Sequence, residues 1–164
     1  MKEHVYETVY LHNQDFEQGR VLFEEWDPQA RYAWDAGIAI GRFLRELKEG
    51  RIVGTRCSSC ARVLVPPRMF CEHCFQPADR WVPVQDTGTV VTFSLCYVTW
   101  DMQRVKEPQI PAVIAIDGSS GGLMHLLGEV RPEDVKIGMR VKAVWKPAAE
   151  RTAAITDILY FKPL

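Results

Sequence analysis

The chain has 164 residues, with 20 basic and 21 acidic side chains and a formal net charge of −1. This balance argues against a general polyanion binder, because affinity for nucleic acid comes largely from contacts between basic side chains and phosphates. The length suits one good core and a small satellite module. No run of about 18 apolar residues occurs, so we expect no membrane span.

The first segment, residues 1–50, is expected to end in a helix. Residues 1–20 lack the apolar core of a signal peptide, so we expect the protein in a reducing cytoplasm. Residues 23–34, FEEWDPQARYAW, are rich in aromatic side chains and contain an Asp-Pro turn. Residues 35–50, DAGIAIGRFLRELKEG, then predict an amphipathic helix with Asp35 as N-cap and Gly50 just past its end.

The apolar stripe of this helix needs a surface to cover, because one amphipathic helix cannot bury itself. The helix could pack on its own C-terminal domain or on a partner chain, and we favour the partner. The stripe recurs at helical spacing and comprises Ala36, Ile40, Phe43, Leu44 and Leu47.

The stretch CSSCARVLVPPRMFCEHC holds four of the five cysteines, Cys57, Cys60, Cys71 and Cys74, in two CxxC pairs. Structural disulfides are rare in a reducing compartment, and a redox dithiol needs only one CxxC turn. Two such turns can instead place four thiolates around one metal ion. With all four positions filled by sulfur, the site would be structural and not catalytic. We expect a small hairpin between the pairs, with Pro66 and Pro67 at its bend.

Zinc is favoured over iron at this site, although both accept four thiolates in a tetrahedron. Rubredoxin-type iron sites usually carry glycine after the second cysteine of each turn, whereas this chain has Ala61 and Phe75 there. His73, beside Cys74, is expected to be a solvated side chain. The predicted cofactor is therefore one structural Zn²⁺ per chain.

Residues 83–164 predict a small β-barrel. In TGTVVTFSLCYV, residues 87–98, we expect Val91, Phe93, Leu95 and Tyr97 on one face. Further strands are expected in PAVIAID, LMHLLGEV, MRVKAVW and AAITDILYF, with a helical turn in RPEDVKIG between the third and the fourth. Five short strands with this turn fit a Greek-key barrel of the OB type.

This segment offers little for nucleic-acid binding or catalysis. Phe93, Tyr97 and Trp100 could stack on bases, but nine basic and nine acidic residues in 83–164 provide no positive groove, so Phe93 and Tyr97 are expected to face inward. Cys96 could meet His125 from another strand, yet nothing near it in sequence would activate a thiolate. A buried, inert Cys96 is expected.

Three motifs together resemble a known family: GRIVGTRCSSCARVLVPPRMFCEHC, then WVPVQDTGTVVTFS, then GMRVKAVW. They are similar to the proteins in which a rubredoxin-like zinc ribbon precedes an OB-fold, accessory proteins of thiolase-type acyl-CoA enzymes. The resemblance covers nearly all of residues 35–164. The longer N-terminal segment is similar to that on small subunits of thiolases in anaerobic aromatic degradation.

The resemblance implies a mainly β fold with an N-terminal helix, in three parts: a partner-docking arm and helix in 1–50, a zinc ribbon in 51–82 and a five-stranded OB-fold in 83–164. It implies a noncatalytic subunit, part of an acyltransferase complex, that binds a thiolase-like catalytic chain and helps enclose or channel acyl-CoA at the shared interface.

Arginines around the ribbon are candidates for contact with the CoA phosphates, because guanidinium suits phosphate as a bidentate donor. Residues 48–82 hold six basic and three acidic side chains, a surplus of three positive charges. Solvated arginines or salt bridges would account for the same surplus. The candidates are Arg56, Arg62 and Arg68, with Arg51 nearby, and Arg68 is the first to test.

Two alternatives to the accessory subunit remain. The chain could be a free-standing module that binds acyl-CoA or nucleic acid, which would show ligand binding by the isolated protein. It could also be an enzyme by itself, in which case Cys96→Ala would abolish turnover. We rank them after the accessory subunit, and expect no nucleic acid and no membrane among its partners.

Overall fold

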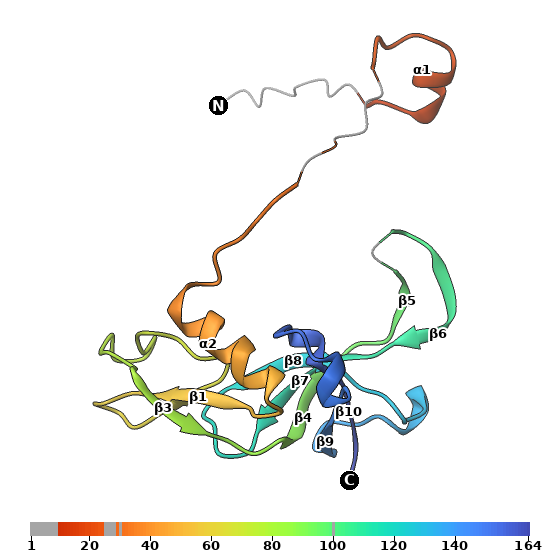
Figure 1. Ribbon diagram of the computed structural model, residues 1–164. Coiled ribbons are helices and arrows are strands. Elements are labelled where there is room, and N and C mark those ends of the chain that lie inside the picture. Colours follow the sequence, from red (N-terminus) through yellow and green to blue (C-terminus); the bar gives the residue numbers. More distant parts are fainter. Residues whose placement is uncertain (1–9, 25–28, 30, 100) are drawn as a thin grey trace, which may run out of the picture. The chain divides into compact units, whose positions relative to one another are not determined.

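The computed structural model describes residues 10–24, 29, 31–99 and 101–164 (Figure 1). The chain forms two compact units, Met1–Trp34 and Asp35–Leu164. In the first unit, α1 (Asn13–Glu17) is one short helix, and none of the unit's described residues is buried. The predicted Asp27–Pro28 turn lies outside the described residues.

Helix α2 (Gly37–Lys48) opens the second unit close to its predicted ends. The Asp35 carboxylate accepts the backbone N–H of Gly37 at 2.8 Å, although the N-cap position itself is Ala36, one residue later than predicted. At the other end Gly50 has φ +73°, and a Cβ there would lie 2.6 Å from Nη1 of Arg151. Glycine therefore meets two needs at once, the left-handed backbone and the approach of Arg151.

The apolar stripe of α2 packs on the protein's own core. Phe43 and Leu47 are 2% and 0% exposed and belong to one cluster with the barrel side chains. The expectation that this stripe covers a partner chain is wrong for these two residues, because the chain itself supplies their surface. Ile38 and Ile40, at 73% and 37% exposed, remain open on the helix.

The zinc ribbon contains β1 (Val53–Arg56), β2 (Val63–Leu64) and β3 (Arg80–Pro83), in the antiparallel order β2-β1-β3. The first cysteine pair lies in the turn between β1 and β2, and a bridge between Phe70 and Pro77 brackets the second pair. The predicted hairpin with its bend at Pro66–Pro67 is wrong. Strands β1 and β2 instead pair around the first cysteine turn, the isolated Phe70–Pro77 bridge spans the second, and the proline segment connects the two turns.

Five strands form the barrel: β4 (Thr87–Phe93), β7 (Pro111–Ile116), β8 (Gly122–Leu126), β9 (Arg140–Trp145) and β10 (Ile158–Pro163). Their order is β10-β9-β4-β7-β8, and a parallel bridge between Leu127 and Phe161 closes the ring. The turn η1 (Pro132–Asp134) lies between β8 and β9, as predicted. The expected five-stranded OB barrel is confirmed.

The predicted alternation of side chains is wrong in β4. In β9, Val141 and Ala143 face the core. In β4, however, Val90 is 1% exposed and Val91 is 49% exposed, the reverse of the prediction. A register shift between Val90 and Thr92 adds one residue opposite β7, and such a bulge resets which side chains face inward.

A separate hairpin, β5 (Cys96–Val98) and β6 (Arg104–Gln109), leaves the barrel between β4 and β7 (Figure 1). The sequence pattern predicts one strand over residues 87–98, where the structure has β4 and β5, and it does not indicate β6. Tyr97 is 47% exposed in this hairpin, so its predicted inward orientation is wrong. Phe93, at the end of β4, does pack against the core.

Within the described ranges, no helix combines the length and the apolar character that a membrane crossing requires.

We predict that Leu47→Ala lowers the free energy of unfolding by about 2–5 kcal/mol, the usual cost of truncating a fully buried leucine. Urea unfolding of the zinc-loaded protein measures the change. Ile38→Ala on the open side of α2 is the matched control and should shift stability by less than about 0.5 kcal/mol. Equal effects of the two variants would contradict the packing of α2 on its own core.

Candidate metal centre

The four predicted ligands converge. The sulfur atoms of Cys57, Cys60, Cys71 and Cys74 all lie within 4.8 Å of one another. The Sγ atoms of Cys57 and Cys74 are 3.4 Å apart, and those of Cys60 and Cys71 are 3.5 Å apart. A tetrahedron with Zn–S bonds of about 2.3 Å has edges of about 3.8 Å, so this arrangement fits one zinc ion. His73 is exposed and is not among these groups.

The turns stabilise thiolates at two of the positions. The backbone N–H of Cys60 is the main cause that lowers the pKa of the Cys57 thiol to about 6, against burial, and the Ser59 N–H adds to it. The N–H of Cys74 likewise lowers the pKa of Cys71. At Cys60 the N–H of Arg62 acts in the same direction, but burial and the neighbouring sulfurs raise the pKa to about 11. A divalent cation supplies the charge that lets all four ligate as thiolates.

Both cysteine turns use the same unusual backbone conformation. Ala61 and Phe75, each directly after the second cysteine of its pair, have φ of 59° and 55°. This left-handed region costs an L-residue roughly 1–2 kcal/mol. The two turns are thus rubredoxin-like in backbone despite the missing glycines.

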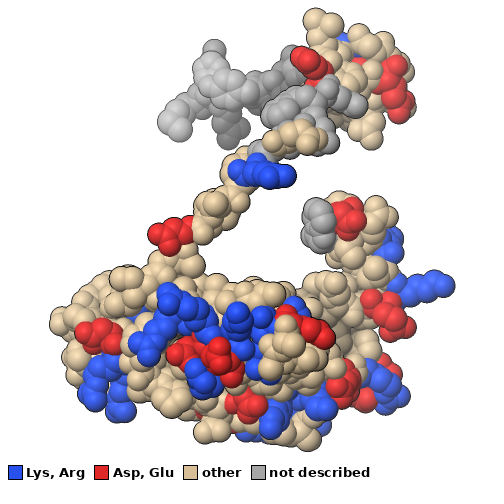
Figure 2. All heavy atoms as spheres, in the orientation of Figure 1, with Lys and Arg blue, Asp and Glu red and all other residues tan. Residues whose placement is uncertain are grey.

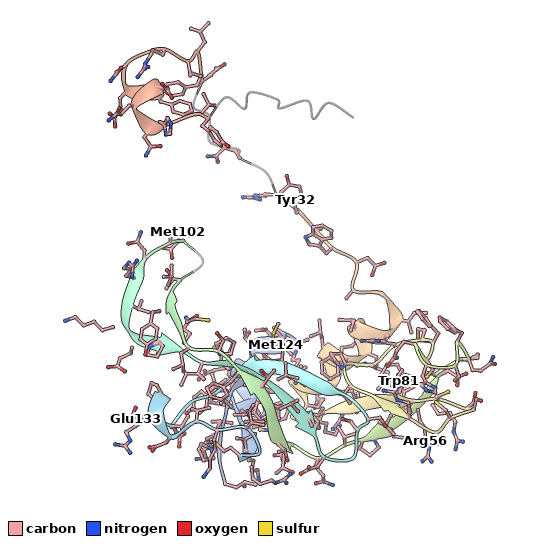
Figure 3. All side chains as sticks on the ribbon, turned by 180° about the vertical axis from the view of Figure 1, so that it is seen from behind. Tyr32, Arg56, Trp81, Met102, Met124 and Glu133 are labelled. Atoms are coloured by element: carbon pink, nitrogen blue, oxygen red, sulfur yellow. The ribbon has the colours of Figure 1, made fainter. Side chains whose placement is uncertain are left out.

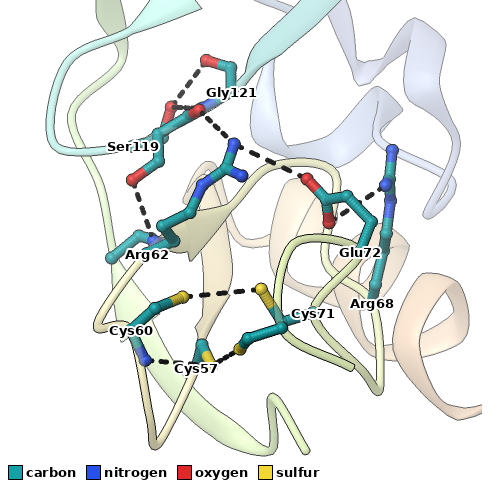
Figure 4. A network of polar contacts seen from close by, with 11 residues as sticks. Cys57, Cys60, Arg62, Arg68, Cys71, Glu72, Ser119 and Gly121 are labelled. Atoms are coloured by element: carbon teal, nitrogen blue, oxygen red, sulfur yellow. Dashed lines mark hydrogen bonds and ion pairs between the residues drawn. The ribbon is translucent and has the colours of Figure 1, made fainter. Parts of the chain in front are cut away.

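A polar network connects the second cysteine turn to the barrel (Figure 4). The Glu72 carboxylate lies 3.6 Å from Nη2 of Arg62 and 3.2 Å from Nη1 of Arg68. Arg62 also donates to the backbone oxygen of Ser120 in the β7–β8 loop at 3.4 Å. Ser120 and Val63 exchange two further bonds, at 2.7 and 3.1 Å. The β7–β8 loop is therefore fastened to the ribbon.

The candidate phosphate-contacting arginines have different surroundings. Arg62 and Arg68 share Glu72, and Arg51 pairs with Glu46 at 2.8 Å. Arg56, labelled in Figure 3, lies directly opposite Arg80 across β1 and β3. Both are exposed, and neither forms an ion pair within the described residues. Like charges in directly opposite positions repel each other. Sequence reasoning missed Arg80, because cross-strand register is not visible in a linear pattern.

The structure does not assemble the alternative Cys96–His125 pair. The neighbour of the Cys96 sulfur is the Ser94 hydroxyl at 4.0 Å. His125 Nδ1 accepts the N–H of Leu126 at 2.9 Å, so the proton on Nε2 is donated to the carbonyl of Ile155 at 3.3 Å. Burial lowers the pKa of His125, which keeps the ring neutral. Trp100, the third stacking candidate, lies outside the described residues.

Charge on the second unit is mixed. Figure 2 shows basic and acidic side chains interspersed over the visible face of the ribbon and barrel. This agrees with the overall balance of the chain, and on the face shown there is no single positive track for a nucleic-acid backbone.

Comparison with known proteins covers both modules. Residues 45–79 match the model of the ChsH2 rubredoxin-like zinc ribbon domain, and residues 81–146 match that of the ChsH2 C-terminal OB-fold domain. A DUF35 domain-containing scaffold protein from Methanocaldococcus jannaschii is 33% identical over 130 residues, which is 75% of this chain and 89% of the relative. This chain belongs to the DUF35 family.

Solved structures agree with this assignment. A DUF35 protein of unknown function from Sulfolobus solfataricus has a TM-score of 0.57 and 30% identity, over 66% of this chain and 78% of that one. The Ltp2–ChsH2(DUF35) aldolase has a TM-score of 0.59 and 24% identity, over 81% and 98%, and shows the same fold. The predicted ribbon–barrel architecture and the zinc ribbon cofactor site of the DUF35 chain are confirmed.

We predict that this DUF35 protein carries about one zinc ion per chain and that Cys57→Ser lowers the zinc content, since three thiolates no longer close the tetrahedron. Elemental analysis after dialysis measures the stoichiometry. Cys96→Ser, outside the cluster, is the matched control and should keep its zinc. Retention of normal zinc content in Cys57→Ser would contradict the four-sulfur site.

Proposed function

We propose that this DUF35 protein is a noncatalytic accessory subunit of a thiolase-fold acyl-CoA enzyme. It binds the catalytic chain and helps enclose or channel the acyl-CoA at their shared interface. The observation that carries the proposal is the closed metal centre: four thiolates leave no position for water or substrate.

Two further features support a subunit without chemistry of its own. Among the described residues, Cys96 and His125 have separate partners and form no nucleophile–base pair. The relative from Methanocaldococcus jannaschii is described as a scaffold protein, a role that needs rigid placement of surfaces and no reactive group. Both features fit a protein that acts through the chains it holds.

The CoA phosphates are proposed to contact the ribbon arginines. Arg56, Arg62 and Arg68 were the candidates from sequence, and the structure distinguishes among them by their neighbours. Glu72 already compensates Arg62 and Arg68, whereas Arg56 and Arg80 have no carboxylate partner within the described part of the chain. A phosphate between Arg56 and Arg80 would relieve their repulsion and accept guanidinium donors from both.

The alternative, a free-standing module that binds acyl-CoA or nucleic acid, has less support. An OB-fold that binds single strands usually pairs stacked aromatics with a positive groove, and residues 83–164 hold as many acidic as basic side chains. The isolated chain is therefore expected to bind oligonucleotides weakly or not at all.

We predict that the purified chain alone has no thiolase activity and that its complex with the proposed thiolase-fold partner chain is active. Co-expression, mass measurement of the complex, and thiolysis assays with and without this subunit provide the test. Turnover by the isolated chain, or full activity of the catalytic chain without it, would contradict the proposed function.

We predict that Arg56→Glu raises the KM of that complex for acyl-CoA by roughly tenfold or more, because charge-assisted hydrogen bonds to phosphate are lost. Arg68→Gln should have a smaller effect, because Glu72 already competes for this guanidinium. Arg131→Gln is the control, because Arg131 already pairs with Glu133 and Asp134 in a barrel loop. An unchanged KM in Arg56→Glu would contradict the proposed phosphate contact of Arg56 and Arg80.

A further inference from the structure

The outer face of β7 and β8 carries two adjoining apolar grooves. One, of about 200 Å³, is lined in part by Phe93, Ser94 and Ala112. The other, of about 290 Å³, is lined in part by His125, Leu126, Ile155 and Thr156. Pro111 and Met124 line both, so the grooves meet at Met124 (Figure 3). In OB-folds the face of the second and third strands, between the loops at its two ends, is the usual binding face.

The chemistry of this face excludes a polyanion. None of the residues that line either groove is Lys, Arg, Asp or Glu. Apolar side chains are presented instead: Met124 is 71% exposed, Ile155 40% and Leu126 39%. Desolvating such a surface favours an apolar occupant.

One wall of the grooves is fixed before anything binds. The Ile155 carbonyl accepts a hydrogen bond from the Nε2–H of His125 at 3.3 Å, which ties η3 (Ile155–Asp157) to β8. The buried Asp157 carboxylate accepts the N–H groups of Thr152 and Ala154 at 2.9 and 3.1 Å. Ile155 is thus presented by a loop with fixed backbone, and a preformed wall reduces the entropy lost on binding.

The β5–β6 hairpin extends the apolar surface beyond what a small ligand can cover. The base of the hairpin adjoins the first groove, because Ser94 and Pro111 both line that groove and the Ser94 N–H donates to the Pro111 carbonyl at 3.0 Å. Its sheet has only two strands, and such hairpins are at best marginally stable alone in water. It exposes further large apolar side chains, namely Leu95, Tyr97, Val98 and Met102. A surface that runs from η3 to the hairpin tip fits a polypeptide.

The hairpin also carries two basic side chains that bear on the charge of that polypeptide. Arg104 and Lys106, two residues apart on β6 and so on one side of the strand, are exposed. Neither forms an ion pair within the described residues. Acidic side chains on the occupant would complement them.

We infer that the β7–β8 face and the β5–β6 hairpin together receive an apolar, carboxylate-flanked segment of the catalytic partner chain. This inference rests on the proposed function and specifies which surface of the barrel makes the contact. The apolar side chains of the segment fill the two grooves at Met124, and its carboxylates face Arg104 and Lys106.

The test uses the full chain co-expressed with the proposed thiolase-fold partner chain. Met124→Glu places a charge where the grooves meet and should weaken the complex at least about tenfold, measured by titration of the purified chains. Arg104→Glu combined with Lys106→Glu should slow association and reduce its dependence on salt. Hydrogen exchange should show β8 and the hairpin becoming protected in the wild-type complex.

Ile137→Glu is the matched control, since Ile137 is 68% exposed and lines neither groove. Zinc content and circular dichroism confirm that each variant is folded. If the wild-type chains form a complex that Met124→Glu leaves intact, the inference is overturned while the proposed function survives. If wild type forms no complex, the proposed function itself fails. Loss of a homodimer, or of acyl-CoA binding by the isolated chain, in Met124→Glu would also overturn the inference, because the occupant would then be a second copy or the ligand.

Discussion

The convergence of four sulfur atoms is the constraint on which the ribbon depends. Its own buried cluster is very small: Leu64 and Ala78 join Cys57 and Cys71, with the other two cysteines packed against them. So few apolar side chains cannot offset the entropy of ordering some thirty residues. Structural zinc contributes an apparent binding free energy of about 10–16 kcal/mol in comparable small modules. Metal binding therefore determines whether the strands around the cysteine turns are ordered at all.

The ribbon then becomes one body with the barrel through both apolar and polar contacts. Ile52, Val53 and Val65 belong to the same buried cluster as the barrel side chains, so the ribbon contributes to the hydrophobic core of the barrel. Two hydrogen bonds add direction to this contact: the Ser120 N–H donates to the Val63 carbonyl, and the Val63 N–H donates to the Ser120 hydroxyl. Order imposed by the metal is thereby transmitted to the loop between β7 and β8.

Helix α2 is fixed to the same body at its C-terminal end. Leu47 is buried in the common core, and Nη1 of Arg151, from the segment between β9 and β10, lies 3.4 Å from the Lys48 carbonyl. A cation beside the last carbonyls of a helix is favourable for its dipole. Arg151 also donates to the Lys146 carbonyl at 2.9 Å, so one guanidinium joins helix and barrel. This explains why the buried half of the stripe needs no partner chain.

Sequence was most informative where chemistry depends on fixed spacing, and least where it depends on register. The doubled CxxC identified all four ligands, and the strands expected in PAVIAID and MRVKAVW coincide with β7 and β9, because both signals are local. Val91 was assigned to the wrong face because a bulge changes the alternation without any mark in the residue types. Two further features depend on pairings between segments that are distant in sequence. One is the surface that α2 covers, and the other is the position of Arg56 opposite Arg80. Such pairings cannot be derived from periodicity alone.

The distribution of charge within the rigid unit separates two kinds of surface. The whole chain is nearly neutral, yet residues 48–82 carry a surplus of three positive charges while residues 83–164 carry none. Exposed arginines therefore gather on the ribbon, whereas the grooves of the barrel are lined without charge. An anion and an apolar polypeptide are solvated so differently that one surface rarely suits both. Because the ribbon and the barrel share one core, the proposed phosphate contact and the inferred partner contact would keep a fixed mutual position, as an accessory subunit requires.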